Sequence, residues 1–491
     1  MDSSARWILL LLLVASVPLR ANASSVVNDF QHCENVVNKW ATSQLNQESK
    51  EDKHMLHDLL FFLHIPRTGG RTYFHCFLKK LYSSQFECPR SYDKLRFNPR
   101  KENCRLLVTH DDYSMMTKLP KEKTSVVTIL RDPLHRVFST YEFSIEVAAR
   151  FLVHPNLTSA TQLAGRLRKK TNGVSTLDIW PWKYLVPWMR EDLFARRDAR
   201  LHKNQKHVKS NDSYNMEDMA MPLHQYINDP IALDIVHNGA AFQVAGLTNN
   251  SYVPESHEVR SCVQKHHSLG KHVLDVAKRR LDHMLYVGLT EDHKGSATAF
   301  AHVVGAQVIS QLSASNSRTE SLADNKSEQS SPIKEFKSAN DGYKSGPGDG
   351  ETTPSEVAEG SSKSTMTVGK LMEAYEVCIT SLRKSQSRRR INSLTRIAPV
   401  NFTKEARLRV HESTIDRIKS LNRLDMELYD YAQDIFARQH HRTMQKLDAE
   451  ATVLNSFGAA PWRESLLVMA VVFVGVSLVI NARRRTSKVK L

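Results

Sequence analysis

The 491-residue sequence lacks several patterns that identify common classes of protein. It contains no GxxxxGK[ST] loop, which excludes a Walker-type nucleotide site. It contains no CxxC pair and no Cys/His spacing typical of a zinc site. Acidic residues are few relative to basic ones, 52 against 68, and the formal net charge of +16 favours anionic partners. Six cysteines are too few for a disulfide scaffold but enough for two or three bridges, whose pairing the sequence leaves open.

Long apolar runs are missing except at the two ends of the chain. Near the N-terminus, Arg6 precedes an apolar run from Trp7 to Val17, and small residues follow at Ala21 and Ala23. This run is too short to span a bilayer and is typical of a cleaved secretory signal, which we predict over residues 1–23.

The second apolar run, Leu466–Ile480, is followed by a basic tail, residues 483–491. It is shorter than the ~20 residues of a usual spanning helix, but its neighbours extend it, and we predict a transmembrane helix over 465–482. Because basic residues stay cytosolic, the protein would be single-pass type I with a luminal body. A luminal body excludes nucleic acid as the anionic partner, permits disulfides and allows its Asn-X-Ser/Thr sequons to be glycosylated. Cys88 and Cys104 could close a small loop there.

Composition divides the luminal part into segments. Residues 24–312 alternate strand and helix patterns and form the first part of the predicted globular domain. Residues 313–366 are rich in Ser, Asn, Glu, Gly and Pro, and we predict a disordered insertion. Residues 367–447 return to helical patterns, including a predicted helix over 413–438, and residues 448–464 are predicted to form a juxtamembrane stem.

The strongest local signal is LLFFLHIPRTGGRTYFHCFLKKLY, residues 59–82. Its apolar start predicts a buried parallel strand, and apolar residues at helical spacing in its second half predict a helix. The loop between them contains two glycines together with Arg67 and Arg71. Glycines let a backbone approach a ligand, and helix-start N–H groups and arginines attract anions. The segment therefore predicts an anion site, with an ordinary strand-to-helix turn as the alternative.

A second basic junction is SVVTILRDPLHRVFSTYEF, residues 125–143. A buried-type strand is followed by Arg131 and then by a predicted helix that carries Ser139. Ligands of open α/β sheets bind beyond the carboxyl ends of strands, so this pair could hold a second phosphate. Asp132 as helix cap, with Pro133 at the first helical position, is a structural explanation that is compatible with the first.

Together these two segments resemble the PAPS-dependent sulfotransferases, whose donor is 3′-phosphoadenosine 5′-phosphosulfate. The resemblance implies an α/β, P-loop-like sulfotransferase fold with a parallel sheet flanked by helices, and no metal. It implies that Arg131 and Ser139 hold the 3′-phosphate, while the Gly-containing loop holds the 5′-phosphosulfate. The residues of that loop are Arg67, Thr68, Gly69, Gly70, Arg71 and Thr72.

Within that family, three segments resemble the heparan sulfate 6-O-sulfotransferase branch. They are LHIPRTGG (63–70), with Arg67 where lysine is usual, MLYVGLTE (284–291) and LNRLDMELYDYA (421–432). The layout of the whole chain, and stretches such as PRTGGRTYFHCFL and THDDYS, resemble the plant tyrosylprotein sulfotransferases. That resemblance implies a Golgi membrane enzyme that sulfates tyrosines in an acidic context in secreted peptide precursors, including peptide hormones.

The resemblance leaves the general base open. A phenol with a pKa near ~10 needs help to lose its proton. In the 6-O branch a histidine of the first helix is the base, but our alignment puts Cys76 there, with His75 before it. His110 is similar to a strand-end histidine of 2-O-sulfating relatives, and Glu142 could act as the carboxylate base of animal enzymes does. Arg67 is predicted to stabilise the leaving phosphate.

Basic residues between Arg383 and Arg409 outnumber acidic ones and match an acidic substrate, although each could simply be a solvated charge. Two other functions stay open. One is a glycan O-sulfotransferase of the heparan sulfate 6-O type, and the other is a non-enzymatic type I receptor or adaptor for anionic ligands.

Overall fold

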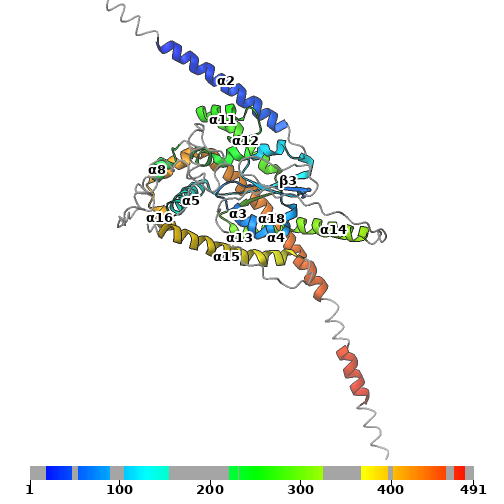
Figure 1. The fold of residues 1–491 in the computed structure, drawn as a ribbon. Helices are drawn as coiled ribbons and strands as arrows, with labels where there is room; N and C mark the ends of the chain where they lie inside the picture. The colour runs from blue at the N-terminus through cyan, green and yellow to red at the C-terminus, as the bar shows by residue number, and fades with distance from the viewer. Residues whose placement is uncertain are drawn as a thin grey trace, which may run out of the picture. The chain divides into compact units, whose positions relative to one another are not determined.

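Four short apolar strands pair in parallel in the order β2-β1-β3-β4 (Figure 1). They are β1 (Leu59–Leu63), β2 (Leu106–Thr109), β3 (Thr124–Leu130) and β4 (Tyr286–Leu289). Nearly all their residues are buried, as expected of a parallel sheet that is covered on both faces. The two predicted strands are β1 and β3, the central pair, in which Phe62 lies opposite Val127.

The computed structural model describes residues 18–46, 54–88, 104–153, 221–229, 232–323, 366–395, 402–459 and 469–480. The chain divides into two compact units, residues 1–436 and residues 437–491. The first unit contains the sheet and every predicted site residue. The second contains the end of a long helix and the helical residues 469–480.

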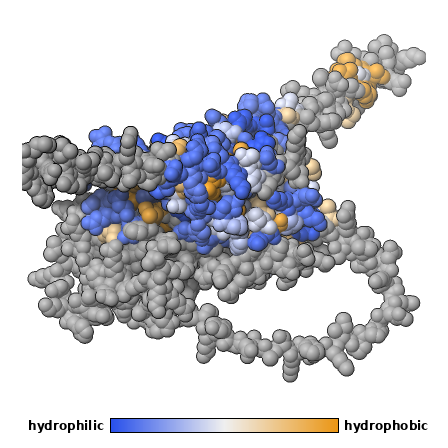
Figure 2. All heavy atoms as spheres, turned by 90° about the horizontal axis from the view of Figure 1, so that it is seen from above, coloured by the Kyte–Doolittle hydropathy of each residue, from blue (hydrophilic) through white to orange (hydrophobic). Residues whose placement is uncertain are grey.

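Helices lie on both sides of the sheet, which confirms the predicted α/β class (Figure 1). One group is α2 (Pro18–Asn46), α10 (Gly239–Val244), α11 (Ser256–Lys265) and α12 (Gly270–His283), which pack on one another. The other group includes α13 (His293–Phe300) and α15 (Val368–Thr395). Apart from the residues drawn in grey, the surface seen in Figure 2 is mostly hydrophilic.

The helix predicted after the Gly-containing loop is present but has a π-helical middle. It consists of α3 (Gly70–Tyr73), the π turn η1 (Phe74–Leu78) and α4 (Lys79–Leu81). Its predicted apolar face is buried, since Phe77 and Leu78 are fully enclosed. Burial of this face fixes the direction of the loop that precedes it.

All six cysteines form bridges within the first unit. Cys88 pairs with Cys104, as the sequence suggested, and Cys33 in α2 pairs with Cys262 in α11. Cys76 in η1 pairs with Cys378 in α15. Because this third bridge joins residues on either side of 313–366, the segment after the predicted insertion belongs to the same unit as the sheet.

The helix predicted over 413–438 is two helices, α17 (Glu412–Leu421) and α18 (Arg423–Ala459). They are separated at Asn422, whose buried side chain donates to the carbonyl of Ile418 and accepts from the amide of Asn238. Such side-chain bonds to the backbone compete with helical ones, which explains the break.

Helices of the structure cross three of the predicted segment boundaries. Helix α14 (Ala306–Ala323) continues past 313, where the insertion was predicted to begin, and residues 324–365 lie outside the described part. Helix α18 continues to Ala459 through most of the predicted stem. The predicted cleavage after Ala23 falls inside α2, and residues 1–17 lie outside the described part.

Of the predicted span 465–482, residues 469–480 are described, and they are helical and exposed. Within the described ranges, no helix has both the length and the apolar content that crossing a bilayer requires.

Candidate functional site

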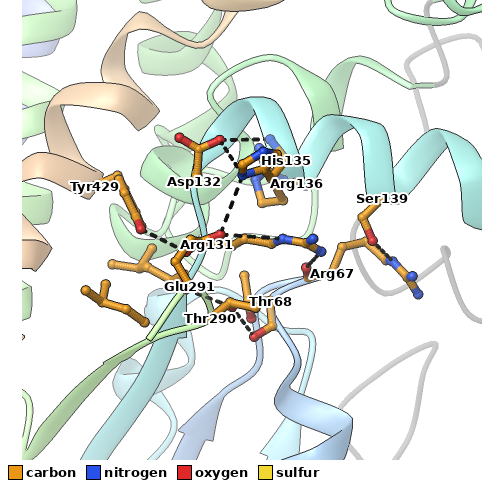
Figure 3. A network of polar contacts seen from close by, with 12 residues as sticks. Arg67, Thr68, Arg131, Asp132, His135, Arg136, Ser139, Thr290, Glu291 and Tyr429 are labelled. Atoms are coloured by element: carbon orange, nitrogen blue, oxygen red, sulfur yellow. Dashed lines mark hydrogen bonds and ion pairs between the residues drawn. The ribbon is translucent and has the colours of Figure 1, made fainter. Parts of the chain in front are cut away.

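The segments that follow all four strands meet at one edge of the sheet. His64 follows β1, His110 follows β2, Arg131 follows β3, and Thr290 follows β4. In Figure 3, Thr290, Arg131 and Arg67 lie together beyond the strand ends. This carboxyl edge is where open α/β sheets bind their ligands.

The loop after β1 has an unusual backbone. Arg67 and Gly69 have positive φ angles of 68° and 83°, and Gly70 begins α3. A positive φ is unfavourable for arginine, and such conformations persist mostly where function requires them. The Thr68 side chain is buried and its hydroxyl donates to the Ile65 carbonyl at 2.9 Å, so only its main-chain N–H suits the predicted anion contact.

The second junction has the predicted cap. Asp132 Oδ1 accepts from the amide of His135 at 2.9 Å, directly before α5 (Pro133–Val153). The second arginine of this segment, Arg136, is buried and donates to Asp425 Oδ2 at 2.7 Å. Asp425 Oδ1 in turn accepts from the Ala241 amide at the start of α10. Arg136 therefore joins α5 to the start of α18 and is structural.

The two predicted phosphate segments touch each other. Arg67 Nε donates to Ser139 Oγ at 3.1 Å, and Arg131 Nη1 donates to the Arg67 carbonyl at 3.1 Å (Figure 3). The Arg67 guanidinium also lies 4.4 Å from the ring centre of Phe143. A single polar network thus contains Arg67, Arg131 and Ser139, which the family resemblance assigns to opposite ends of one ligand.

Positive charge is concentrated in this network. Burial, and then the charge of Arg67, lowers the pKa of Arg131 to about 10. Arg131 Nε lies 3.8 Å from Glu291 Oε1, and Tyr429 donates to the other oxygen of Glu291 at 2.8 Å. An anion placed beside Arg67 and Arg131 would relieve their mutual repulsion.

Glu142, one helical turn beyond Ser139, is held by two arginines. Arg407 donates to both carboxylate oxygens at 2.7 Å, and Arg390 donates to one at 3.1 Å. Burial raises the pKa of Glu142, but these hydrogen bonds and charges outweigh it and hold the pKa below its ordinary value. A low pKa makes a poor proton acceptor, which argues against Glu142 as the base.

Cys76, which aligns with the catalytic histidine of the 6-O branch, has a structural role. Cys76 is buried and bridged to Cys378. Its neighbour His75 is partly exposed, and its ring packs edge-on against Phe74 with centroids 5.1 Å apart.

His110 has an oriented ring at the strand edge. Its Nδ1 lies 2.8 Å from the carbonyl oxygen of His64. Because a carbonyl only accepts, Nδ1 carries the proton and Nε2 is the acceptor nitrogen of the neutral ring. His110 is 8% exposed, so the ring is held among protein groups and has a preset proton-accepting atom.

Sequence reasoning missed three contributors. Thr290 Oγ1 donates to the Thr68 carbonyl at 2.7 Å, and buried Gln243 donates to the carbonyl oxygens of His64 and His110. His64 could have been recognised because it is a polar residue near the end of the first predicted strand. Thr290 lies in the segment 284–291, which resembles the 6-O branch, whereas no local signal marks Gln243.

The chain is similar to known sulfotransferases, although no family model matches it. A protein-tyrosine sulfotransferase from Arabidopsis thaliana is 57% identical over 480 residues, which cover 94% of this chain and 95% of the relative. Heparan-sulfate 6-O-sulfotransferase 2 from Gallus gallus is 39% identical over 61 residues, 12% of this chain and 15% of the relative. Heparan-sulfate 6-O-sulfotransferase 3 from Homo sapiens is 42% identical over 45 residues, 9% of this chain and 10% of the relative.

Proposed function

The chain belongs to the protein-tyrosine sulfotransferase family, and on that premise we propose that it transfers a sulfuryl group from PAPS to the phenolic oxygen of tyrosines in secreted peptide precursors. The observation that carries the proposal is the contact between the two basic segments, Arg67 to Ser139, in a chain that is similar to that relative along nearly its whole length.

The donor-binding groups fit a ligand with phosphates at both ends. PAPS would supply the activated sulfuryl group. Main-chain N–H groups from Thr68 to Arg71, with the side chains of Arg67 and Arg71, would hold the 5′-phosphosulfate at the start of α3. The Thr72 N–H donates to the Gly69 carbonyl at 2.9 Å, so Thr72 would contribute its side chain. Arg131 and Ser139 would hold the 3′-phosphate, whose negative charge would offset the repulsion between Arg67 and the half-buried Arg131.

Transfer then requires charge stabilisation and proton removal. By analogy with phosphoryl transfer, the main work is to position the reactants in line and to stabilise spread negative charge. Arg67 would stabilise the oxygen of the leaving phosphate. His110 would take the phenolic proton on Nε2, since its Nδ1 proton is held by the His64 carbonyl, with His75 as the second candidate. These roles need no metal.

The acceptor would be a tyrosine beside acidic residues. Arg390 and Arg407 reach α5 through Glu142, one turn from Ser139, so the basic stretch 383–409 adjoins the donor network. Arg383 and Arg388 on α15 are exposed and would attract acidic side chains of a peptide.

We also propose the cellular setting that the sequence predicts. The protein would be a single-pass type I protein of the Golgi membrane, with signal peptide 1–23, transmembrane helix 465–482 and cytosolic tail 483–491. Three disulfides suit a luminal domain.

The test offers the full-length protein PAPS and one of two acceptors, a tyrosine peptide flanked by acidic residues or a desulfated heparan chain. We expect a sulfate ester on the tyrosine peptide and none on a matched phenylalanine peptide. Transfer to the glycan alone would support the 6-O alternative. No transfer, with anion binding that survives Arg131→Ala, would support the receptor or adaptor alternative.

A further inference from the structure

Three aromatic rings stack at the carboxyl ends of β1 and β2. The rings of Phe62 and His64 lie 5.6 Å apart at 7°, and those of His64 and His110 lie 4.3 Å apart at 30°. His64 is therefore the middle ring of the stack, which ends at the proposed base.

The strand register produces this stack. Residues 62 and 64 point to the same face of the sheet, because side chains alternate along a strand. Leu63 pairs with Thr109, and the His64 amide donates to the Thr109 carbonyl at 3.1 Å, so positions 64 and 110 are adjacent.

The edge of the His64 ring lies against the Gly-containing loop. A Cβ atom added to Gly70 would collide with Cδ2 and Nε2 of His64. The imidazole thus fills the space between the first residue of α3 and the His110 ring, and this packing requires glycine at position 70.

The main chain around the two histidines is also restrained. The His64 carbonyl accepts from His110 Nδ1, and Gln243 Nε2 donates to the carbonyl oxygens of residues 64, 110 and 111 at 3.1–3.3 Å. Gln243 is fully buried. The hydrogen bond from His110 Nδ1 does not by itself fix the plane of the His110 ring, because the ring can still rotate about the axis of that bond. The flat face of the His64 ring limits this rotation.

We propose that His64 is a positioning residue for His110. Its ring, held between Gly70 and Phe62, sets the plane of the His110 imidazole so that Nε2 meets the acceptor hydroxyl. This inference rests on the proposed function. A reacting group misplaced by about 1 Å typically loses about 100-fold in rate, so a positioning role of this kind is measurable.

The experiment compares His64→Ala with His64→Phe in the full-length protein, because phenylalanine keeps a flat ring and removes both nitrogens. We expect His64→Ala to lower kcat about 10- to 100-fold, and His64→Phe to recover most of it. Both variants should bind 3′,5′-ADP within about twofold of wild type, since the His64 ring has no contact with PAPS in the proposed site. If His64→Ala fails to fold, His64→Leu takes its place, because leucine fills volume without a flat face.

A second readout does not depend on turnover. The Nδ1 proton of His110, assigned by its loss in His110→Ala, should exchange with water faster in His64→Ala than in His64→Phe. Equal exchange in both variants would overturn the inference even if the proposed function also failed. Unchanged kcat in both variants would overturn the inference as well, because the ring would then have no role in turnover. Equal losses of kcat in both variants would show that the ring nitrogens matter, and weakened 3′,5′-ADP binding would show that the ring contacts the nucleotide. Either result would also overturn the inference.

Discussion

The Nε–H of Arg67 donates a 3.1 Å hydrogen bond to Ser139 Oγ across 72 residues of sequence. The same arginine offers its carbonyl oxygen to Arg131. The loop after β1 and the helix after β3 are therefore tied to each other by hydrogen bonds within the chain. Such preorganisation lowers the conformational cost of holding a nucleotide that spans both segments.

Arg131→Ala should weaken binding of 3′,5′-ADP by about 10- to 100-fold, since a hydrogen bond to a charged group contributes about 1.5–3 kcal/mol. Titration calorimetry measures the affinity, and thermal unfolding checks the fold. The matched control is Arg423→Ala, which removes an exposed arginine at the start of α18 and should leave the affinity unchanged. Wild-type affinity in Arg131→Ala would remove Arg131 from the site.

His110→Ala should lower kcat by about 100-fold or more while 3′,5′-ADP affinity stays within about twofold, because a general base acts on the acceptor and not on the donor. His75→Ala is the comparison and should have the smaller effect. Steady-state kinetics with a tyrosine peptide decides between them. A large loss in His75→Ala alone would make His75 the base, and wild-type turnover in both variants would end the histidine proposal.

Asp111 should make stability depend on pH. Burial raises its pKa to about 7, although a hydrogen bond from Thr109 acts in the opposite direction. An unfolded aspartate titrates near ~3.9, so the folded state holds the extra proton between these values, and its stability falls as pH rises through that range.

The variant Asp111→Asn removes this titration. Its melting temperature should exceed that of wild type at about pH 8 and approach it at about pH 3, where the wild-type carboxyl is mostly protonated in both states. Thermal unfolding across this range is the measurement. A difference between the two proteins that does not change with pH would contradict the assignment.

Loss of the Cys76–Cys378 bridge should destabilise the first unit by about 2–5 kcal/mol. The bridge closes a sequence separation of 302 residues, so it restricts the unfolded chain strongly. Cys76→Ala, Cys378→Ala and the double variant should unfold at similar denaturant concentrations, because each breaks the same bond. Loss of Cys88–Cys104, separated by 16 residues, should cost less. Additive losses for Cys76 and Cys378 would show that the two side chains act separately.

Several features were predictable because they depend on neighbours in sequence. The apolar runs predicted β1 and β3, and Asp132 with Pro133 predicted the start of α5. Helix breaks that depend on distant partners were not predictable. Asn422 divides α17 from α18 through a contact with Asn238, which lies 184 residues away.

The two basic strand-to-helix junctions could be predicted without a structure, because glycine, proline and apolar spacing act locally on the backbone. The partner of each polar side chain could not, because it depends on how distant segments pack. In the folded chain, Arg136 pairs with Asp425, Glu142 with Arg390 and Arg407, and Cys76 with Cys378. These partners lie far apart along the chain, and sheet register and helix packing, which follow from burial of the whole core, bring them together.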